Sequence, residues 1–334
     1  MTATVVAGGL WGDEGKGKVV AYLALRDEPA IIARGGVGPN AGHTVFVEGR
    51  KYVMRQVPVG FVQRKARLLI GPGVLVDPEV TMDEVARLKI KPGRLGIDGA
   101  CTVIEPEHRR EDQSRSHLVD VVGTTGTGTG PANEARVGRR ARLARDDSQL
   151  APYIADVAAE VGVAIAAGDQ VLVEGSQGLG LSLYHGDYPY CTSKDTSASA
   201  LCADVGLGPT NVANVVVVLK AYASRVGNGP FPTELDPAEV EIRGWEEFGA
   251  VTGRPRRIGE FDYERSARAV MISGATDLAI TNLDRRFPGA AGVRDLEGLP
   301  PEARAFVDGI EERLAVPATL LSTGPDAWEM IDRR

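Results

Sequence analysis

The stretch Gly8-Gly9-Leu10-Trp11-Gly12-Asp13-Glu14-Gly15-Lys16-Gly17-Lys18 decides the fold class of this chain. It follows the β-branched run Thr4 to Ala7, and from Gly12 to Lys18 it has the spacing G-x-x-x-x-G-K of a phosphate-binding loop. Glycines at these positions let successive backbone N–H groups point at phosphate oxygens, and the helix that follows adds its positive N-terminus. We therefore expect a triphosphate site between a first strand and a first helix. The residues expected around it are Gly12, Glu14, Gly15, Lys16, Gly17 and Lys18.

The loop lacks the hydroxyl side chain that usually holds Mg²⁺ in such a motif, because Val19 follows Lys18. Asp13, inside the loop, is well placed to replace it, since Mg²⁺ binds one or two carboxylates together with phosphate oxygens. A charged surface turn that binds no phosphate is the alternative interpretation of so short a motif. Other parts of the sequence are needed to decide between a phosphate-binding loop and a charged surface turn.

Short β-branched runs alternate with Ala-rich helical stretches along the chain. The runs are Thr4 to Ala7, Ala30 to Ala33, Leu68 to Ile70, Arg94 to Ile97, Gln170 to Glu174, Val215 to Leu219 and Asp277 to Thr281. Helices are expected at Pro78 to Leu88, Asp147 to Ala167 and Pro301 to Leu314, each of which opens with a residue that helix starts prefer. This alternation predicts an α/β fold with a mostly parallel central sheet flanked by helices. We expect residues 1–334 to form a single domain, with ligand loops at the strand ends.

The composition of the 334 residues is that of a globular protein, with 43% hydrophobic and 25% charged residues. No window approaches the roughly eighteen unbroken apolar residues of a membrane span, and the first residues carry no charged leader, so we expect a cytoplasmic protein. The odd number of cysteines, Cys101, Cys191 and Cys202, fits no disulfide framework and no zinc site. A formal net charge of −7 argues against a surface that binds duplex nucleic acid, although local Arg and Lys clusters can still bind anionic substrates.

A series of short blocks resembles the adenylosuccinate synthetase family, in the family's order and over nearly the whole chain. After Trp11 to Lys18, the blocks are Asn40-Ala-Gly-His43, Gly123-Thr-Thr-Gly126, Gly130-Pro-Ala132, Val173-Glu-Gly-Ser-Gln-Gly178, Tyr188-Pro-Tyr-Cys-Thr-Ser193, Gly229-Pro-Phe-Pro-Thr-Glu234, Thr252-Gly-Arg254 and Ser322-Thr-Gly-Pro325. The length is similar to that of the family's short, archaeal-type form. The resemblance implies a P-loop-like, GTP-binding ligase fold and a reaction that joins L-aspartate to C6 of a purine 5′-monophosphate.

The resemblance also implies a reaction through a 6-phosphoryl purine. Asp13 would remove the N1 proton as general base while also contacting Mg²⁺, and His43 would hydrogen-bond O6 and the phosphoryl group in transfer. The amine of aspartate would then displace phosphate. Lys16 and Gln177 complete the implied catalytic set, and the carbonyl of Gly42 would be a second metal ligand.

Two of these assignments have plain structural alternatives. An isolated histidine such as His43 is more often a satisfied structural residue, but its position after Asn-Ala-Gly in the family order favours catalysis. Lys16 and Lys18 resemble phosphate clamps, and a solvated position on the helix is the alternative for one of them.

By resemblance, one set of residues would hold the purine monophosphate: Asp13, Asn40, Thr125, Arg139, Gln177, Thr192, Val226 and Asn228. Arg139 would reach across from a second subunit, so we expect a homodimer; an ordinary solvated charge is the alternative for Arg139. A second set, Thr252, Arg254 and Arg256, resembles the loop that binds the two carboxylates of aspartate, a task that suits the planar guanidinium group. Pro255 interrupts the run of arginines that is usual in that loop.

The stretch Thr281-Asn-Leu-Asp284 indicates which base the triphosphate carries. The carboxylate of Asp284 accepts hydrogen bonds from both N1–H and the 2-amino group of guanine, whereas adenine presents an unprotonated N1. By resemblance to the family's guanine-binding loops, Asn282, Ser322 and Gly324 would line the same pocket, although the family often has Lys where Asn282 stands. We therefore expect GTP rather than ATP as the co-substrate, and a helix cap after a strand is the alternative role of Asp284.

Four positions around the expected purine depart from the family's common pattern: Leu10, Cys191, Asn228 and Glu260. They narrowly favour a 2-amino purine, namely deoxy-GMP converted to N6-succino-2-amino-2′-deoxyadenylate as in some viral relatives, with Asn228 accepting from the added amine. The retained Asp13 argues the other way, because those relatives commonly have a small residue in its place. Conversion of IMP to adenylosuccinate is the alternative.

Two other classes of protein are more remote alternatives. A guanine-nucleotide-binding switch protein needs segments whose order depends on the γ-phosphate, and that function leaves His43 and Gln177 unexplained. A small-molecule kinase would form a stable phosphorylated product and would not incorporate aspartate. Aspartate-dependent turnover of GTP separates a ligase from both.

Overall fold

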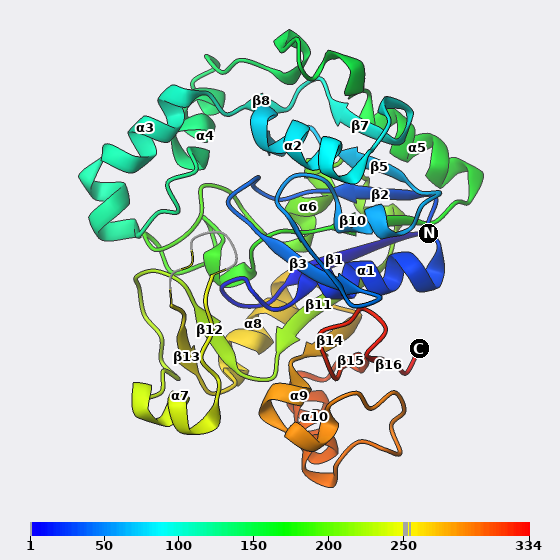
Figure 1. The fold of residues 1–334 in the computed structure, drawn as a ribbon, viewed down its shortest axis with the longest axis vertical. Helices are drawn as coiled ribbons and strands as arrows, with labels where there is room; N and C mark the ends of the chain where they lie inside the picture. Colours follow the sequence, from blue (N-terminus) through cyan, green and yellow to red (C-terminus); the bar gives the residue numbers. More distant parts are fainter. Residues whose placement is uncertain (1, 250–252, 254) are drawn as a thin grey trace.

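A ten-stranded, mostly parallel sheet forms the centre of the described part of the molecule (Figure 1). The computed structural model describes residues 2–249, 253 and 255–334. Across the sheet the strands follow the order β16 (Met330–Asp332), β15 (Ala318–Ser322), β14 (Asp277–Thr281), β11 (Val212–Lys220), β1 (Ala3–Gly8), β10 (Val171–Glu174), β2 (Ile31–Arg34), β5 (Arg67–Ile70), β7 (Leu95–Asp98) and β9 (Ile154–Ala155). Neighbouring strands are parallel except β15 and β16. The expected α/β fold with a mostly parallel central sheet is confirmed.

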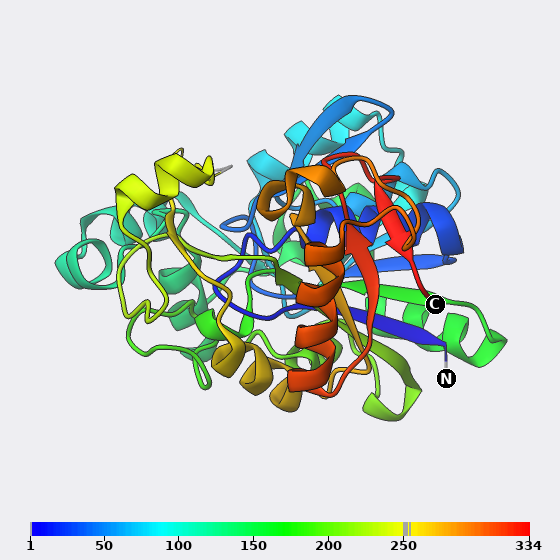
Figure 2. The same ribbon diagram turned by 90° about the horizontal axis from the view of Figure 1, so that it is seen from below.

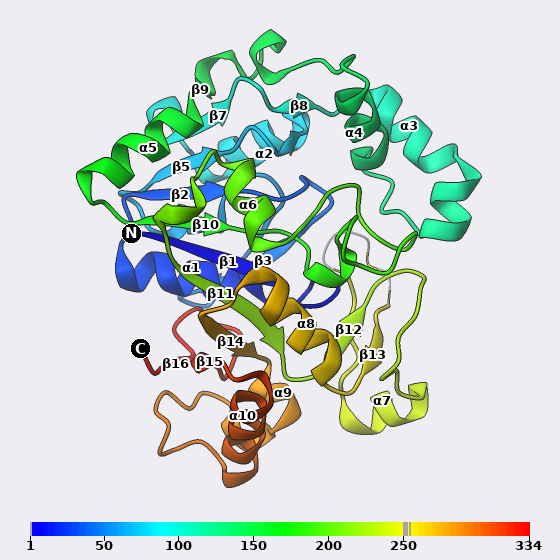
Figure 3. The ribbon, with the colours of Figure 1, turned by 180° about the vertical axis from the view of Figure 1, so that it is seen from behind.

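Helices cover both faces of this sheet because its strands direct apolar side chains to both sides. Val5 and Val6 of β1 belong to opposite cores, and Val215 to Leu219 of β11 are each at most 9% exposed. The helices on one face are α1 (Lys16–Asp27) and α2 (Pro78–Leu88), and those on the other are α5 (Val157–Ala167), α6 (Ala198–Asp204), α8 (Tyr263–Ser273) and α10 (Pro301–Leu314) (Figures 1 and 3). The site therefore rests on a sheet that is buried from both sides.

The seven predicted strands all lie in the central sheet, and α2 and α10 have the predicted bounds. The prediction of a helix from Asp147 to Ala167 is wrong in its first half, because α5 begins only at Val157. Pro152 has no N–H group for a helix interior, and it lies in a short 3-10 turn before β9. The side chain of Asp156 then accepts a hydrogen bond from the backbone N of Ala159 (2.9 Å) and starts α5 as its N-cap.

Smaller elements lie outside the ten-stranded sheet. They are β3 (His43–Val47), β4 (Arg50–Met54), β6 (Leu75–Val76), β8 (Thr102–Val103), α3 (Pro106–Ser114), α4 (Thr129–Val137), β12 (Ala223–Arg225), α7 (Pro237–Arg243), β13 (Arg257–Gly259) and α9 (Leu283–Arg286). The two termini lie on the side of the molecule away from α7 (Figures 1 and 2). Because β1 starts at that side, the carboxyl ends of β1, β10, β11 and β14 point toward β12 and β13 (Figure 1).

The cysteines and the lengths of the helices bear on two further expectations from the sequence. Cys101, Cys191 and Cys202 are free cysteines, two of them buried. In the described part of the chain, no helix is both long and apolar enough to cross a membrane.

Candidate active site

The loop between β1 and α1 has a left-handed backbone at three positions. These are Gly12 (φ 83°), Asp13 (φ 61°) and Gly15 (φ 85°), and glycine adopts this conformation at little steric cost. Helix α1 begins at Lys16 without a side-chain cap, and the backbone N of Lys18 already donates to the carbonyl of Gly15 (3.0 Å), so the N–H groups that can meet an anion are those before Lys18. The loop therefore has the geometry that the sequence motif predicts for a phosphate-binding loop.

Glu14 organises the interior of this loop. One oxygen of its carboxylate accepts hydrogen bonds from the backbone N of Leu10 (3.0 Å) and of Gly12 (2.8 Å), and the other accepts from Nζ of Lys16 (2.6 Å). A Cβ atom added to Gly8 would lie 2.7 Å from both the carboxylate of Glu14 and Nζ of Lys16, so the pair is packed on the end of β1. Glu14 therefore positions the ammonium group of Lys16 inside the loop.

Asp13 lies against a buried group of charges. Its carboxylate forms an ion pair with Arg256 (3.0 Å), and Arg256 also pairs with Glu247 (2.6 Å). Glu247 in turn pairs with Lys220 (2.5 Å), the last residue of β11. Burial raises the pKa of Asp13 above its ordinary value, while the positive charges of Arg256 and Lys220 oppose that rise. Asp13 is therefore a carboxylate with an increased affinity for a proton, which suits a general base.

His43 begins β3 and directs its ring at Glu174, the last residue of β10. Nδ1 of His43 lies 2.7 Å from the carboxylate of Glu174, which also accepts from Arg34 (2.6 Å) and from the backbone N of Val59 (2.7 Å). Burial and the charge of Arg34 outweigh the opposing effect of Glu174 and lower the pKa of His43 to about 4. Near pH 7 the ring is therefore neutral, with Nδ1–H donating to Glu174. Nε2 of His43 is buried and has no hydrogen-bond partner among the described residues, so it is available to a ligand.

Asn40 and Gln177, both expected at the purine monophosphate, are brought together. Nε2 of Gln177 donates to Oδ1 of Asn40 (3.0 Å), and Oε1 of Gln177 accepts from the hydroxyl of Ser176 (2.7 Å). Gln177 has a left-handed backbone (φ 56°) directly beyond β10. The hydroxyl of Thr125 bonds to that of a neighbouring threonine, and Thr192 donates its backbone N–H to a carbonyl of the 179–181 turn. Both threonines stay predictions for substrate binding.

Three other residues expected at the purine lie on exposed or half-buried loops. Val226 directly follows β12 and is partly buried. The side-chain amide of Asn228 donates to the carbonyls of Asp120 (3.2 Å) and Val121 (3.1 Å), which leaves its oxygen as the group open to a ligand. Arg139 is exposed just beyond α4, and its side chain forms no ion pair within the described residues. Of the residues expected to bind aspartate, Thr252 and Arg254 lie outside the described residues, and Arg256 contacts Asp13 as above.

The segments expected to bind guanine are connected to the phosphate loop. Asn282 has a left-handed backbone (φ 60°) and precedes α9, and Asp284 lies in the first turn of that helix, where burial raises the pKa of its carboxyl group. Nζ of Lys18 donates to the hydroxyl of Ser322 (2.8 Å), to the carbonyl of Gly324 and to the carbonyl of Glu329 (2.7 Å). The side chain of Lys18 therefore lies against the expected base loop, although the motif had suggested a phosphate clamp.

Comparison with known proteins decides the family. Residues 5–147 and 140–288 match the family described as adenylosuccinate synthetase. The chain belongs to the adenylosuccinate synthetase family. It is 55% identical over 336 residues to the adenylosuccinate synthetase of Thermococcus onnurineus (strain NA1) and 54% identical over 334 residues to that of Archaeoglobus fulgidus, in each case covering 100% of this chain and 99% of the relative. As a member of this family the protein is a ligase that forms a C–N bond, and neither a switch protein nor a kinase.

Two solved structures resemble the chain over almost its whole length. The fully ligated adenylosuccinate synthetase from Plasmodium falciparum has a TM-score of 0.92 at 23% identity, with 100% of both chains covered. The succinoaminodeoxyadenylate synthetase (PurZ) of cyanophage S-2L, bound to dGMP and to dATP as an energy donor, has a TM-score of 0.83 at 26% identity, covering 99% of this chain and 95% of that one. The expected adenylosuccinate synthetase fold is confirmed.

Three charged residues of this synthetase site were not predicted from the sequence. Glu174 contacts His43, and Lys220 and Glu247 form the group behind Asp13 and Arg256. A charged residue at the end of an apolar strand was a signal for Glu174 and Lys220, because such a side chain is buried only with a partner. Glu247 lies outside every block of the resemblance and gave no signal.

The residues at the loop fit the Mg²⁺ ion that adenylosuccinate synthetases use. The described part of the chain contains no group of three or more His, Cys, Asp or Glu side chains that could hold a metal alone. An ion there would depend on few protein ligands, with phosphate oxygens of the substrate completing its shell, which is how Mg²⁺ is commonly bound at phosphates. The carboxylate of Asp13, 28% exposed, and the carbonyl of Gly42 are the protein oxygens proposed for it.

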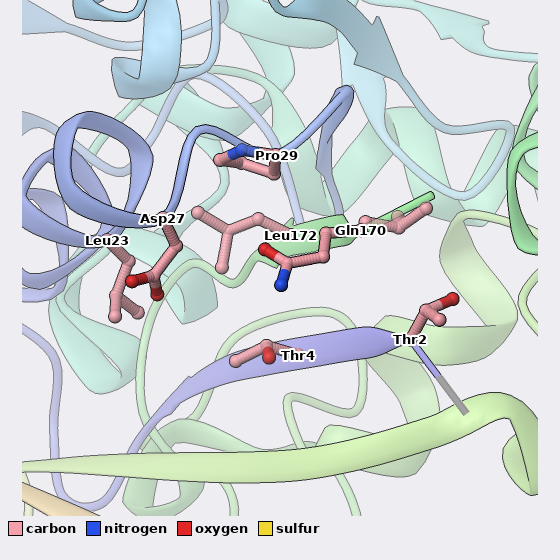
Figure 4. A pocket seen from close by; sticks show the side chains of 8 residues that line it. Thr2, Thr4, Leu23, Asp27, Pro29, Gln170 and Leu172 are labelled. Carbon is pink, nitrogen blue, oxygen red and sulfur yellow. The ribbon is translucent and has the colours of Figure 1, made fainter. Parts of the chain in front are cut away.

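A small cavity lies at the other end of the sheet (Figure 4). Its volume is about 20 Å³, and Thr2, Thr4, Leu23 and Gln170 are among its lining residues. That volume is enough for roughly one water molecule. Because it lies at the amino-terminal ends of β1 and β10, it is separate from the phosphate loop and cannot hold a nucleotide.

Proposed function

We propose that the enzyme joins L-aspartate to C6 of IMP and forms adenylosuccinate, with GTP as the co-substrate. The observation that carries the choice of IMP is the 50–55% identity, over the whole chain, to relatives named adenylosuccinate synthetase. Identity to the phage enzyme bound to dGMP is 26%. IMP is therefore better supported than deoxy-GMP, which the sequence departures had narrowly favoured.

Contacts inside the protein account for two of those departures. Leu10 is 3% exposed and packs in a small apolar cluster. Glu260 pairs with Arg243 and Arg286. Leu10 and Glu260 therefore have structural partners without a 2-amino group on the substrate, which supports IMP. The amide nitrogen of Asn228 is bonded to backbone carbonyls and its oxygen stays open to a ligand, so Asn228 does not separate the two purines.

In the first proposed step, the carboxylate of Asp13 takes the N1 proton of IMP, and the charge moves to O6. O6 then attacks the γ-phosphorus of GTP, the bond from that phosphorus to the β,γ-bridging oxygen breaks, and GDP leaves. The N–H groups at the start of α1 and the ammonium of Lys16 bind the phosphates. The buried, unpartnered Nε2 of His43 is the atom that would donate to O6 and to the phosphoryl group in transfer, because negative charge there would raise the pKa of His43 and favour a protonated ring. Bound Mg²⁺ would neutralise part of the phosphate charge.

In the second proposed step, the neutral amine of aspartate attacks C6, the bond from C6 to O6 breaks, and phosphate leaves with the former O6 and with the proton that the amine loses. Asn40 and Gln177, already bonded to each other, orient the purine monophosphate. Arg256 binds a carboxylate of aspartate together with Thr252 and Arg254, because a guanidinium group matches a carboxylate in geometry and charge. The two steps together consume one GTP for each aspartate joined.

We also propose that the enzyme is a homodimer in which Arg139 completes the purine site of the partner subunit. Arg139 is exposed, and Val137, two residues before it, is 77% exposed. Subunit interfaces bury apolar side chains and are enriched in arginine, so an exposed valine near an arginine fits such an interface. Residues 1–334 form a single domain in this proposal, because both large core clusters pack against the same sheet.

A competition assay tests the choice of purine. The purified protein is given GTP, Mg²⁺ and aspartate, with IMP, GMP and deoxy-GMP at equal concentrations, and succinylated products are resolved by mass. We expect adenylosuccinate to exceed each 2-amino product by about tenfold or more, the discrimination that a poorly accommodated substituent commonly gives. A predominance of succino-2-amino-deoxyadenylate would replace IMP by deoxy-GMP in this proposal.

A further inference from the structure

Lys18 ends the phosphate-loop motif, yet its side chain leaves the loop. Only 7% of the residue is exposed, and Nζ donates to Ser322 (2.8 Å), Gly324 and Glu329 (2.7 Å). An ammonium group has three donors, so these three acceptors satisfy all of them. In phosphate-binding loops of this spacing the lysine usually reaches the β- and γ-phosphates. In this protein the equivalent ammonium group has no donor left for phosphate.

The acceptors of Lys18 belong to the segment proposed to bind guanine. Ser322 ends β15, which pairs in parallel with β14, and β14 leads directly to Asp284. Burial lowers the pKa of Lys18 to about 8, and the negative charges of Asp284, Glu329 and Asp326 oppose that shift. A second connection runs the same way, because the hydroxyl of Thr281 donates to the carbonyl of Glu14 in the phosphate loop (2.6 Å). Both strands that carry base-binding residues are thus bonded to the loop or to the first turn of α1.

We propose that Lys18 is a specificity-positioning residue: it holds the Ser322 to Gly324 segment in the arrangement that accepts a guanine base. The contact of a lysine with phosphate falls to Lys16, whose ammonium group Glu14 holds inside the loop. This inference rests on the proposed use of GTP and assigns Lys18 to the base instead of the phosphates. It predicts that a change at the end of the phosphate motif alters base selection.

The experiment compares Lys18→Met, which keeps the length of the side chain and removes its donors, with Lys16→Met and the wild type. Guanosine, which has no phosphate, and inorganic tripolyphosphate, which has no base, are each measured as competitive inhibitors of GTP. The ratio of kcat/KM for GTP to that for ATP is measured for each protein. For Lys18→Met we expect the inhibition constant of guanosine to rise, and the GTP:ATP ratio of kcat/KM to fall, by about tenfold or more each. A change of this size corresponds to the loss of roughly one hydrogen bond to a charged group. The inhibition constant of tripolyphosphate should stay within about twofold of the wild-type value in Lys18→Met. In Lys16→Met, by contrast, inhibition by tripolyphosphate should weaken more than inhibition by guanosine.

Other results overturn the inference. If Lys18→Met weakens inhibition by tripolyphosphate and leaves inhibition by guanosine and the GTP:ATP ratio unchanged, Lys18 is an ordinary phosphate ligand. An equal loss of both inhibitors, with raised KM for IMP and aspartate, would mean general disorder of the loop. A wild-type protein without preference for GTP would overturn the proposed co-substrate and this role with it, whereas a wild-type preference that Lys18→Met retains would overturn the role of Lys18 alone.

A second variant keeps the test valid if Lys18→Met does not fold. Ser322→Ala removes one of the three acceptors and leaves the ammonium group bonded to two carbonyls. We expect it to lower the GTP:ATP ratio in the same direction by about threefold, the lower range for a single neutral hydrogen bond. Asp284→Asn replaces the carboxylate proposed to bind guanine, so its GTP:ATP ratio of kcat/KM gives the value expected when the preference for GTP is lost completely. A GTP:ATP ratio unchanged in Ser322→Ala but lost in Asp284→Asn would contradict a role of the Lys18 bonds in base selection.

Discussion

Replacing Asp13 with asparagine is expected to lower kcat by about 10²- to 10⁴-fold, the usual contribution of a general base. The amide cannot take the N1 proton of IMP, and it keeps the size of the side chain. Asparagine also tolerates the left-handed backbone of this position (φ 61°), whereas alanine would add strain. Steady-state turnover with saturating GTP, aspartate and IMP measures the effect.

Glu28→Gln is the matched control for Asp13→Asn. Glu28 is also left-handed (φ 47°), but it is exposed at the other end of α1. We expect the control to keep wild-type turnover, and both variants to melt within about 1.5 °C of the wild type, a shift of about 1 kcal/mol for a chain of this length. Turnover of Asp13→Asn close to that of the wild type would remove Asp13 from the proposed mechanism.

Replacing Glu174 with glutamine is expected to lower both kcat and stability. The fully buried carboxylate of Glu174 accepts hydrogen bonds from His43, Arg34 and Val59 with its two oxygens. A glutamine amide has only one accepting oxygen, so its NH2 group would face at least one of these N–H donors. We expect kcat to fall by about 10²-fold, the upper range for a residue that orients a functional histidine. The free energy of unfolding should fall by about 3–5 kcal/mol, because the buried Arg34 loses its partner.

Glu84→Gln separates loss of stability from loss of orientation. Glu84 is 2% exposed and accepts hydrogen bonds from the backbone N of Arg55, Gln56 and Val57, without contacting His43. Measured well below its melting temperature, this control should keep kcat within about twofold of the wild type, as expected away from the reacting atoms. An equal fall of kcat in both variants would assign Glu174 a structural role only.

Much of the fold could be predicted from sequence because parallel strands are buried on both faces and therefore read as apolar runs. Val215 to Leu219 is such a run, and it lies beside β1 in the centre of the sheet. The helix expected from Asp147 failed where a proline and a second capping aspartate divide the segment. A pattern of composition does not reveal which of two possible caps starts a helix.

The site was less accessible to sequence, because its charges meet across long separations in the chain. Glu174 lies 131 residues from His43 and 140 residues from Arg34. Glu247 stands outside the family blocks, yet it joins Lys220 to Arg256 behind Asp13. Lys18 has the right spacing for a phosphate ligand, but spacing does not determine where a side chain points, and its bonds lead to the base loop.

In the proposed mechanism O6 of IMP is phosphorylated before aspartate displaces it, so that oxygen must leave in the phosphate. IMP labelled with ¹⁸O at O6 is incubated with the enzyme, GTP, Mg²⁺ and aspartate, and the phosphate released is analysed by mass. We expect one ¹⁸O in the phosphate for each adenylosuccinate formed. Unlabelled phosphate, released in step with adenylosuccinate, would contradict a 6-phosphoryl intermediate and the roles proposed for Asp13 and His43.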